Sequence, residues 1–387
     1  MNSVELFAGA GGLALGMAEA GFHHKAIVEW NHWACSTIRA NRDRGFHLVK
    51  DWPEPYEGDV RTFTYDDLSG VRVVSGGPPC QPFSIGGKHK GYDDKRDMFP
   101  EAVRAVRELQ PDAFIFENVR GLLRPAFASY LEYVVLRLQH PRLAKATNES
   151  WRDHLSRLEA HHTGGGEADY RVVYQDLDAA DYGVPQRRHR VVFVGFRKGL
   201  GVGWSFPRAD HSLDALLHAQ WVEGSYWDEH KVPKKRRPGF PDRHRRRIER
   251  LAVDGSQGKR WRTVRDALSG LPEPRERQAA IGARNHFLQP GARSYKGHTG
   301  SPLDLPSKAL KAGVHGVPGG ENMLRRPDGS VRYFSVREAA RLQTIPDDYG
   351  LEGPWSEAMR QLGNGVPMQL SRIVAGSVRE VLEGAGA

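Results

Sequence analysis

Short apolar runs alternate with segments of helical periodicity along the first half of the chain. The runs are rich in apolar and β-branched side chains and are bounded by turn residues, at 3–7, 25–29, 71–75, 113–117, 172–176 and 191–196. Several of these runs are separated by helical patterns at 12–20, 33–41, 98–109 and 128–139. The alternation predicts an α/β fold with a largely parallel sheet. In such a sheet, ligands bind beyond the carboxyl ends of the strands.

The pattern changes after about residue 198. Trp, Pro and Gly are scattered among basic residues there, and two basic runs stand at 234–237 and 243–247. We expect a second, irregular module to begin at this point. A solvated surface is the ordinary interpretation of such runs, and they become candidate phosphate contacts if the chain acts on nucleic acid. Helical patterns return at 335–342 and 356–382.

Composition narrows the classes of protein to which the chain can belong. Its 387 residues allow two or three domains, and 56 Lys and Arg against 47 Asp and Glu favour a polyanionic partner. Only two cysteines occur, Cys35 and Cys80, which argues against a disulfide framework or a cysteine-rich zinc site. The sequence starts without a signal-peptide pattern and has no apolar run near the roughly 20 residues of a membrane span. We therefore expect a soluble, intracellular protein.

A glycine-rich turn follows the first apolar run, which ends at Phe7. Residues 8–12 read Ala-Gly-Ala-Gly-Gly, which is typical of a nucleotide-type cofactor loop because glycine lets the backbone approach a ligand closely. The spacing departs from Gly-x-Gly-x-x-Gly, which disfavours a dinucleotide oxidoreductase. Glu29 is placed to accept hydrogen bonds from a ribose, Trp30 to stack on a base, and Asp59 lies on the same side. Without the turn, Glu29 and Trp30 would be interpreted as a surface acid and a packing aromatic.

Cys80 is the candidate nucleophile. It follows a buried-looking run and a Gly-Gly-Pro-Pro turn, which presents a small side chain at the edge of the sheet where ligands bind. A thiol near its reference pKa of about 8.5 is only a few per cent thiolate at neutral pH, so such a cysteine needs a favourable environment or substrate assistance. Cys35 lies in a helical pattern between small residues and is interpreted as a packing residue.

Two further elements place charged side chains near the same predicted edge. An apolar run ends at Glu117 and Asn118, and the carboxyl group becomes a proton donor if an apolar pocket raises its pKa. A strand-terminal salt bridge is the alternative role for Glu117. Arg188 and Arg190 alternate where the last apolar run begins, and they could hold a base oxygen, a phosphate or a carboxylate. A solvated basic turn is the ordinary alternative there.

These segments, in this order, resemble the DNA cytosine-C5 methyltransferases. The matching pieces are 5–12 (Glu-Leu-Phe-Ala-Gly-Ala-Gly-Gly), 77–84 (Gly-Pro-Pro-Cys-Gln-Pro-Phe-Ser), 117–119 (Glu-Asn-Val), 186–190 (Gln-Arg-Arg-His-Arg), 337–343 (Arg-Glu-Ala-Ala-Arg-Leu-Gln) and 363–367 (Gly-Asn-Gly-Val-Pro). The resemblance implies a Rossmann-like sheet of the S-adenosylmethionine-dependent methyltransferases with a smaller, irregular target-recognition domain. The implied boundaries are 1–198 for the catalytic domain, 199–354 for target recognition and 355–387 for a C-terminal segment that returns to the catalytic domain.

The resemblance also implies S-adenosylmethionine as the cofactor and no metal. The cofactor-binding residues that it implies are Phe7, Ala8, Gly9, Gly11, Gly12, Leu13, Glu29, Trp30, Asp59, Val60, Pro79, Asn364 and Val366. Of these, Asn364 and Val366 belong to the returning C-terminal segment.

Catalytic roles follow from the same resemblance. Cys80 adds to C6 of a cytosine, Glu117 protonates or hydrogen-bonds N3, and Arg190 contacts the cytosine carbonyl. Asn118 and Arg188 orient the loop and the base, which must be flipped out of the duplex. The implied DNA contacts, in and near a stretch that resembles the family's mobile catalytic loop, are Ser84, Lys88 and Arg96.

Double-stranded DNA is the implied partner, read by the stretch beyond about residue 200. The short architecture resembles prokaryotic modification enzymes, which implies a cytoplasmic, nucleoid-associated monomer paired with a separate restriction endonuclease. Residues 309–310, Ala-Leu, depart from the Thr and apolar residue that the family usually has there. The alternatives are an RNA cytosine methyltransferase, a catalytically silent DNA-binding relative and, less favoured, an oxidoreductase or a cysteine hydrolase.

Overall fold

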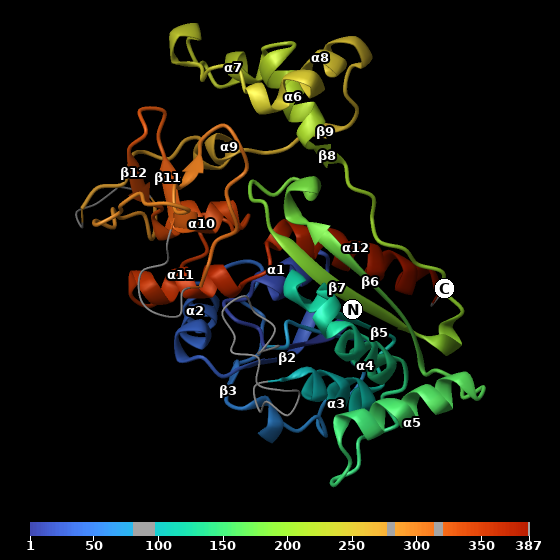
Figure 1. Ribbon diagram of the computed structural model, residues 1–387. Helices are drawn as coiled ribbons and strands as arrows, with labels where there is room; N and C mark the ends of the chain where they lie inside the picture. The colour runs from blue at the N-terminus through green and yellow to red at the C-terminus, as the bar shows by residue number, and fades with distance from the viewer. Residues whose placement is uncertain (80–96, 277–282, 313–319, 386–387) are drawn as a thin grey trace. The chain divides into compact units, whose positions relative to one another are not determined.

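The part of the chain that the computed structural model describes consists of residues 1–79, 97–276, 283–312 and 320–385 (Figure 1). The chain divides into two compact units. Unit 1 comprises Met1–Leu177, His189–Pro207 and Ser371–Ala387, and unit 2 comprises Asp178–Arg188 and Arg208–Leu370. Within the described ranges, no helix combines the length and the apolar character that a bilayer span requires.

Unit 1 is built on a seven-stranded sheet in the order β3-β2-β1-β4-β5-β7-β6. Its strands are β1 (Asn2–Leu6), β2 (His23–Glu29), β3 (Tyr56–Glu57), β4 (Val73–Gly76), β5 (Ala113–Val119), β6 (Tyr170–Asp178) and β7 (His189–Arg197). The pairs β1–β2, β1–β4, β2–β3 and β4–β5 are parallel, and β7 runs antiparallel to β5. The prediction of an α/β fold with a largely parallel sheet is thus confirmed.

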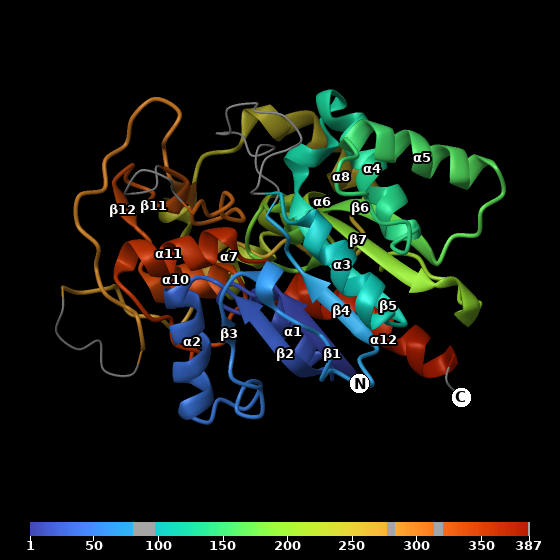
Figure 2. The ribbon, with the colours of Figure 1, turned by 90° about the horizontal axis from the view of Figure 1, so that it is seen from below.

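Unit 1 also contains helices, which lie alongside this sheet (Figure 2). They are α1 (Gly12–Glu19), α2 (His32–Asp43), α3 (Phe99–Leu109), α4 (Ala128–Gln139), α5 (Trp151–Thr163) and α12 (Met368–Ala385). The sequence pattern predicts each of them except α5, which buries His154 and Leu158 and exposes most of its other side chains. A hydrogen bond of 2.8 Å joins the Tyr133 hydroxyl to Nδ1 of His154 and so attaches α5 to α4. A second, of 2.9 Å, joins the rings of His140 and His162.

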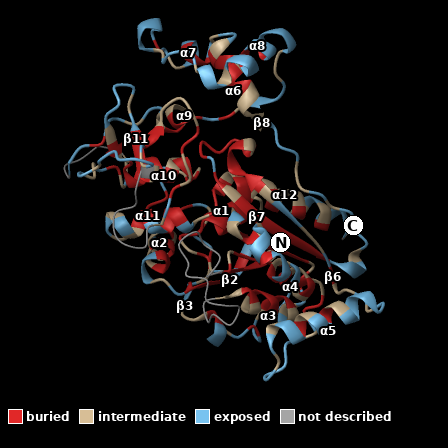
Figure 3. Cartoon of the chain, in the orientation of Figure 1, coloured by how far each residue is buried: buried red, intermediate tan, exposed pale blue. Residues whose placement is uncertain are grey.

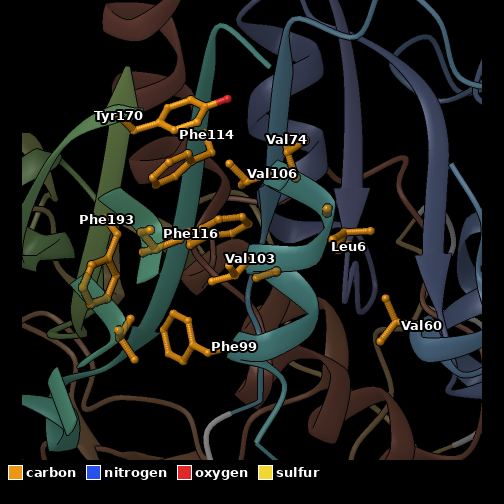
Figure 4. Packing of buried hydrophobic residues seen from close by; sticks show 14 of the residues in the cluster. Leu6, Val60, Val74, Phe99, Val103, Val106, Phe114, Phe116, Tyr170 and Phe193 are labelled. Atoms are coloured by element: carbon orange, nitrogen blue, oxygen red, sulfur yellow. The ribbon is translucent and has the colours of Figure 1, made fainter. Parts of the chain in front are cut away.

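The main apolar core lies on one face of the sheet (Figure 4). Successive side chains of a strand point to opposite faces, so Leu6 of β1, Val74 of β4 and Phe116 of β5 share this face. They belong to one buried cluster with Phe99 and Val103 of α3. Figure 3 shows the resulting buried layer along the central strands. The strands read as apolar runs in the sequence because helices cover them.

The opposite face of β1 buries polar side chains, and α1 covers them. The His24 ring lies 3.0 Å from the Ser3 hydroxyl and 3.0 Å from the carbonyl oxygen of Ala14 in α1. Helix α1 also packs closely on α12, where the Ser371 hydroxyl donates a 2.7 Å hydrogen bond to the Leu13 carbonyl oxygen. Gly16 allows this approach, because a Cβ there would lie 2.5 Å from Ser371 Cβ and 2.6 Å from the backbone nitrogen of Arg372.

Unit 2 is irregular, with strands of two or three residues. Its helices are α6 (Leu213–Trp221), α7 (Ser225–Glu229), α8 (Arg245–Asp254), α9 (Val264–Leu268), α10 (Val336–Leu342) and α11 (Trp355–Asn364). Its strands are β8 (His211–Ser212) with β9 (Lys259–Arg260), and β10 (Ser301–Pro302) with β11 (Met323–Arg325) and β12 (Val331–Tyr333). Short 3₁₀ helices across both units lie at Val60–Thr62, Arg120–Leu123, Pro125–Phe127, Ala179–Tyr182, Lys198–Leu200, Lys234–Arg236, Asp242–His244 and Gly320–Asn322.

Buried aromatic and charged side chains stabilise unit 2. Leu216, Tyr226 and Trp227 form one apolar cluster around α6 and α7. At α10, the Arg332 guanidinium donates 2.7 Å hydrogen bonds to both carboxylate oxygens of Glu338, which also takes part in the capping box at Ser335. A buried carboxylate and guanidinium thus satisfy each other and a helix terminus, as burial of charge requires.

We expect Gly16→Ala to lower the free energy of unfolding by about 1 kcal/mol. Overpacking against the backbone of α12 should outweigh the gain of about 1 kcal/mol that alanine gives in a helix. Urea denaturation followed by circular dichroism measures the change.

Gly376→Ala in α12 is the matched control, because a Cβ there meets no atom within 4 Å. This substitution should raise stability by up to about 1 kcal/mol. Equal effects of the two substitutions would contradict a tight contact between α1 and α12.

Candidate active site

The strand order of unit 1 reverses between β1 and β4, since β1 leads outward to β2 and β4 leads outward to β5. The crevice beyond the carboxyl ends at such a reversal is the usual ligand site of an open α/β sheet. In the register, Leu6 pairs with both Val28 and Gly76, and Gly76 pairs with Phe116. The residues that follow these strands therefore meet at one edge of the sheet.

The turn after β1 has an unusual backbone. Phe7 (φ 55°), Gly9 (φ 54°) and Gly11 (φ 87°) all lie in the left-handed region. This conformation costs a non-glycine residue such as Phe7 roughly 1–3 kcal/mol and persists only where the surroundings enforce it. Gly11 is the N-cap of α1 and provides no side-chain cap, so the first turn of the helix can present its N–H groups to an anionic ligand. Ala8, Gly12 and Leu13 are buried within this turn.

Glu29 holds the turn in place from the end of β2. Its carboxylate accepts hydrogen bonds from the backbone N–H groups of Gly9 (2.7 Å), Trp30 (2.9 Å) and Asn31 (2.8 Å). Burial raises the pKa of this carboxyl above its ordinary value, and the N–H donors oppose that rise. A carboxylate has about four acceptor positions, so a ribose hydroxyl can still be bound. Beside it, the Trp30 side chain is 78% exposed and offers a free aromatic face.

Asp59 and Val60 follow β3 on the same side of the sheet. Asp59 caps the short helix Val60–Thr62 by accepting a 3.0 Å hydrogen bond from the backbone N–H of Arg61. The Arg61 guanidinium also pairs with this carboxylate and lowers its pKa below the ordinary value. Val60 is buried in the main core. Asp59 is therefore ionised and solvent-accessible, whereas Val60 fixes the position of the turn.

Glu117 and Arg190 form a buried ion pair at the ends of β5 and β7. Val119 is paired with Arg190 in the antiparallel register, so Glu117, two residues earlier, is a diagonal neighbour on the same face. Gly77, after β4, leaves room for the acid, because a Cβ there would lie 2.9 Å from Glu117 Oε2. The carboxylate and the guanidinium thus lie side by side at the edge of the sheet.

Asn118 ties the end of β5 to the Gly-Gly-Pro-Pro turn. Its side-chain amide donates a 3.0 Å hydrogen bond to the Pro78 carbonyl oxygen, and its own oxygen accepts one of 2.8 Å from the Val119 N–H. The Pro79 carbonyl oxygen in turn accepts a 3.0 Å bond from the N–H of Met98. The residues on both sides of segment 80–96 are therefore anchored to each other. The predicted residues Cys80, Ser84, Lys88 and Arg96 lie outside the described residues.

The remaining predicted site residues belong to unit 2. Arg188 is almost fully buried, and its guanidinium donates to the carbonyl oxygens of Leu310 (2.9 Å) and Gly363 (2.6 Å). Asn364, the last residue of α11, is exposed, and Val366 is buried. The contacts of Arg188 join distant segments of unit 2. A contact of Asn364 and Val366 with a cofactor stays a prediction.

Two anchoring side chains are not predicted by the sequence pattern. Asp97 accepts a 2.5 Å hydrogen bond from the Tyr130 hydroxyl and one of 3.1 Å from the N–H of Phe99, which fixes the point where the chain enters α3. An aspartate just before a helix is a capping signal that could have indicated it. In unit 2, the buried Arg337 donates to the carbonyl oxygens of Pro346 (2.8 Å) and Tyr349 (2.7 Å). Arg337 begins the matching piece 337–343, but nothing in that piece indicates that its side chain is buried.

Glu5 is a third side chain whose environment the sequence did not indicate. It lies in the centre of β1, fully buried, and is hydrogen-bonded to the Ser75 hydroxyl of the neighbouring strand β4. Its other oxygen, Oε1, has no hydrogen-bond partner among the described residues. Burial raises the pKa of Glu5 to about 8, against the smaller opposite effect of Ser75. The carboxyl group is therefore largely protonated at neutral pH.

The sequence model of the C-5 cytosine-specific DNA methylase family matches residues 1–140 and 164–380 of the chain. Residues 141–163, which contain α5, are not part of this match. The chain is 29% identical to the Type II methyltransferase M.NgoMIV of Neisseria gonorrhoeae over 382 residues, which cover 99% of this chain and 98% of the relative. It is 32% identical to the Type II methyltransferase M.Eco47II of Escherichia coli over 384 residues, covering 98% of this chain and 79% of the relative.

Solved structures share the fold. One, described as a DNA modification methyltransferase encoded within an E. coli prophage, superposes with a TM-score of 0.59 at 22% identity and covers 99% of each chain. The Dnmt2 methyltransferase of S. pombe gives a TM-score of 0.56 at 16% identity over the whole of both chains. At these identities the likeness concerns the fold alone.

We expect Glu5→Gln to remove a pH dependence of stability. In the unfolded chain the carboxyl ionises near its ordinary value of about 4.3, whereas in the folded chain it keeps its proton up to about 8. The wild-type stability contributed by this group is therefore lost as pH rises between these values. Between pH 5 and pH 8, the free energy of unfolding of the variant should therefore rise relative to that of the wild type by roughly 1–4 kcal/mol. This range follows from about 1.4 kcal/mol for each unit of pKa shift. Urea unfolding at several pH values measures this difference.

Glu249→Gln is the control, since it removes an exposed carboxyl group of α8. Its stability should follow the wild-type pH profile. A parallel profile for Glu5→Gln would show that Glu5 is ionised in the folded chain.

Proposed function

The chain belongs to the C-5 cytosine-specific DNA methylase family and is a DNA (cytosine-5-)-methyltransferase, and we propose that it methylates a flipped cytosine within a specific duplex sequence. The observation that carries the proposal is the edge of the unit 1 sheet. There, the turn braced by Glu29 follows β1, and the pair of Glu117 and Arg190 lies at the carboxyl end of β5 and the amino end of β7. Methyl transfer to a base requires a cofactor site and a base site close together, and both proposed sites lie at the same edge of the sheet.

S-adenosylmethionine is the proposed cofactor, and when bound it supplies an electrophilic methyl group. The uncapped first turn of α1 suits its carboxylate, and the carboxylate of Glu29 suits the ribose hydroxyls. Trp30 stacks on the adenine, because its ring is exposed beside Glu29. The residues that we propose to complete the site are Phe7, Ala8, Gly9, Gly11, Gly12, Leu13, Asp59, Val60, Pro79, Asn364 and Val366.

The base is held by Glu117 and Arg190. N3 and O2 are neighbouring atoms of cytosine, so they call for two hydrogen-bonding groups side by side. The paired carboxyl and guanidinium groups have this arrangement. Once the base displaces Glu117 from the ion pair, Arg190 donates to O2, and Glu117 takes up a proton and donates it in a hydrogen bond to N3 as charge develops on the ring. Asn118 acts as a positioning residue, because it holds the Pro78 carbonyl just before the nucleophile.

Cys80 starts the reaction by addition of its thiolate to C6, which forms a C–S bond and makes C5 nucleophilic. S-adenosylmethionine, which the turn after β1 and Glu29 would hold, would supply the methyl group to this activated C5. Loss of the C5 proton to a base and cleavage of the C–S bond restore the ring and release Cys80. We propose that Ser84, Lys88 and Arg96 contact the DNA during these steps and that Arg188, with Asn118, helps to orient the loop and the base, as the family resemblance implies.

A role in a restriction-modification system is the proposed biological context. The relatives M.NgoMIV and M.Eco47II are named Type II methyltransferases, and the chain spans 98% of the length of the first. We propose residues 199–354 as the target-recognition domain and 355–387 as a segment returning to the catalytic domain 1–198. The enzyme then acts as a monomer in the prokaryotic cytoplasm, beside the nucleoid, and protects a site that a separate endonuclease cleaves.

Incubation with tritiated S-adenosylmethionine tests this proposal. Label should enter duplex DNA, and bisulfite sequencing should place 5-methylcytosine in one recurring sequence. Cys80→Ser should lower the rate by at least about 1000-fold, because it removes the nucleophile. Label that enters only RNA or adenine would contradict the proposed activity.

Cys35→Ala is the control for Cys80→Ser. Burial raises the pKa of the Cys35 thiol to about 12, so this residue cannot supply a thiolate near neutral pH. Its variant should keep activity close to wild type. A covalent complex between Cys80→Ser and DNA that carries 5-fluorocytosine in the mapped sequence would exclude Cys80 as the nucleophile.

Glu29→Gln should weaken S-adenosylmethionine binding by about tenfold or more. The carboxylate now accepts hydrogen bonds from backbone N–H groups, and the amide NH₂ of glutamine would face one of these donors instead. An unsatisfied buried donor costs roughly 1–3 kcal/mol. Isothermal titration calorimetry measures the affinity. Glu57→Gln is the matched control, since Glu57 is the sheet neighbour of Glu29 and pairs with Arg39 and His32 instead. Unchanged affinity in Glu29→Gln would contradict the bracing role.

A further inference from the structure

A pocket of about 430 Å³ within unit 2 takes no part in the proposed chemistry. It lies between α6 and α7, the loop around 238–244, and the turn that joins β11 to β12. Its volume is within the roughly 300–1,000 Å³ of small-molecule sites. The lining is mainly apolar and includes Trp221, Trp227, Pro238, Pro241 and Pro327.

The aromatic wall of this pocket is fixed in position. Trp227 is almost fully buried, and its indole N–H donates a 2.6 Å hydrogen bond to the Gln220 carbonyl oxygen. Trp221 is half-buried and packs edge-to-face on Trp227, with ring centroids 5.6 Å apart. Phe240 packs on Trp221 in the same manner, at 5.5 Å. The Trp221 indole is thus a held aromatic surface on which a planar ligand can stack with little loss of side-chain entropy.

The charge around the pocket is positive. Arg243 and Arg325 line it with exposed side chains, and neither has an ion-pair partner within the described part of the chain. Arg326, also in the lining, is paired with Glu273 at 2.9 Å. The acid of the lining, Asp304, accepts 2.6 Å and 2.9 Å hydrogen bonds from Arg265 and from the Tyr226 hydroxyl. Two guanidiniums therefore remain available for an anionic group.

A flat apolar wall beside two available guanidiniums matches the chemistry of a nucleotide, which joins a planar base to a phosphate. An apolar peptide would leave Arg243 and Arg325 without partners, and an inorganic anion would leave the Trp221 wall uncovered. The excess of Lys and Arg over Asp and Glu, 56 against 47, further favours an occupant from a polyanion.

We propose that this pocket receives a second nucleotide of the DNA substrate, displaced from its stack, in addition to the cytosine that is methylated. Its base stacks on Trp221, and its phosphate is bound by Arg243 and Arg325. The proposal rests on the proposed function, because the nucleotide comes from the same duplex. It makes the pocket a specificity determinant, since the cost of unstacking and the fit of the base depend on which nucleotide enters.

A thermodynamic cycle with abasic DNA tests the proposal. Duplexes carry the mapped methylation sequence, with one abasic position moved stepwise through the site, and affinities are measured by fluorescence anisotropy. At one position other than the target cytosine, loss of the base should weaken wild-type binding by roughly 5- to 100-fold. Trp221→Leu should bind the intact duplex more weakly by a similar factor and should not respond to the abasic site there. Additive effects of the two changes at every position would overturn the proposal.

A pair of double variants covers the case in which Trp221→Leu does not fold. Arg243→Ala with Arg325→Ala removes the two available guanidiniums and should lower affinity for the duplex by about tenfold or more. Arg247→Ala with Arg250→Ala removes the same charge from guanidiniums that are both paired with Asp214, and should have a much smaller effect. Equal effects of the two double variants would overturn the phosphate role.

The experiments distinguish failure of the second-nucleotide proposal from failure of the proposed function. They also distinguish a nucleotide of the duplex from a free nucleotide. If the wild-type chain neither binds nor methylates duplex DNA, the proposed function fails. If it does both and the cycle shows additivity, only the second nucleotide fails. Deoxynucleoside monophosphates are titrated as a further arm, and binding that Trp221→Leu abolishes, together with additivity on the duplex, would assign the pocket to a free nucleotide instead.

Discussion

The carboxylate of Glu29 holds together the part of unit 1 on which the proposed chemistry depends. Its hydrogen bonds reach Gly9 in the turn after β1, and Trp30 and Asn31 after β2. Asn31 in turn caps α2 by accepting a 3.0 Å bond from the N–H of Ala34. One buried acid therefore fixes the turn, the aromatic residue beside it and the start of a helix. The strained backbone at Phe7 can persist because these hydrogen bonds hold the neighbouring residues in place.

At the other strand ends, too, side-chain contacts hold the site residues in place. Asn118 holds the Pro78 carbonyl, Arg190 neutralises Glu117, and the absence of a side chain at Gly77 leaves space for the acid. These groups have protein partners before a substrate arrives, so they need little reorganisation when it binds. A base that enters the site exchanges one set of hydrogen bonds for another. This exchange limits the desolvation cost that buried charges otherwise carry.

The sequence predicts the strands and helices of unit 1 well where burial dictates composition. Covered parallel strands such as β5 read as apolar runs, and the helices between them keep their periodicity. Helix α5 escapes prediction because only His154 and Leu158 are buried along it. The antiparallel direction of β7 is also absent from the pattern, since alternation of side chains does not depend on strand direction.

The spacing of Glu29 indicates its place, but its N–H donors depend on backbone geometry that only the folded chain has. The short strands of unit 2 depend on distant contacts and leave no local signal.

Helix α5 has a consequence for how this chain can vary. It belongs to the stretch that the family match omits, and the chain around it is fixed at the end of the sheet opposite Glu117 and Arg190. There the N–H of Asp169 donates to the Gln139 carbonyl oxygen at 2.9 Å, and the Tyr170 hydroxyl donates to that of Pro111 at 2.8 Å. Insertions at this end leave the reacting edge unchanged, provided that they bring their own apolar contacts. Evolution can therefore lengthen the enzyme here almost independently of its chemistry, and a fusion or a graft at this end would leave the reacting edge in place.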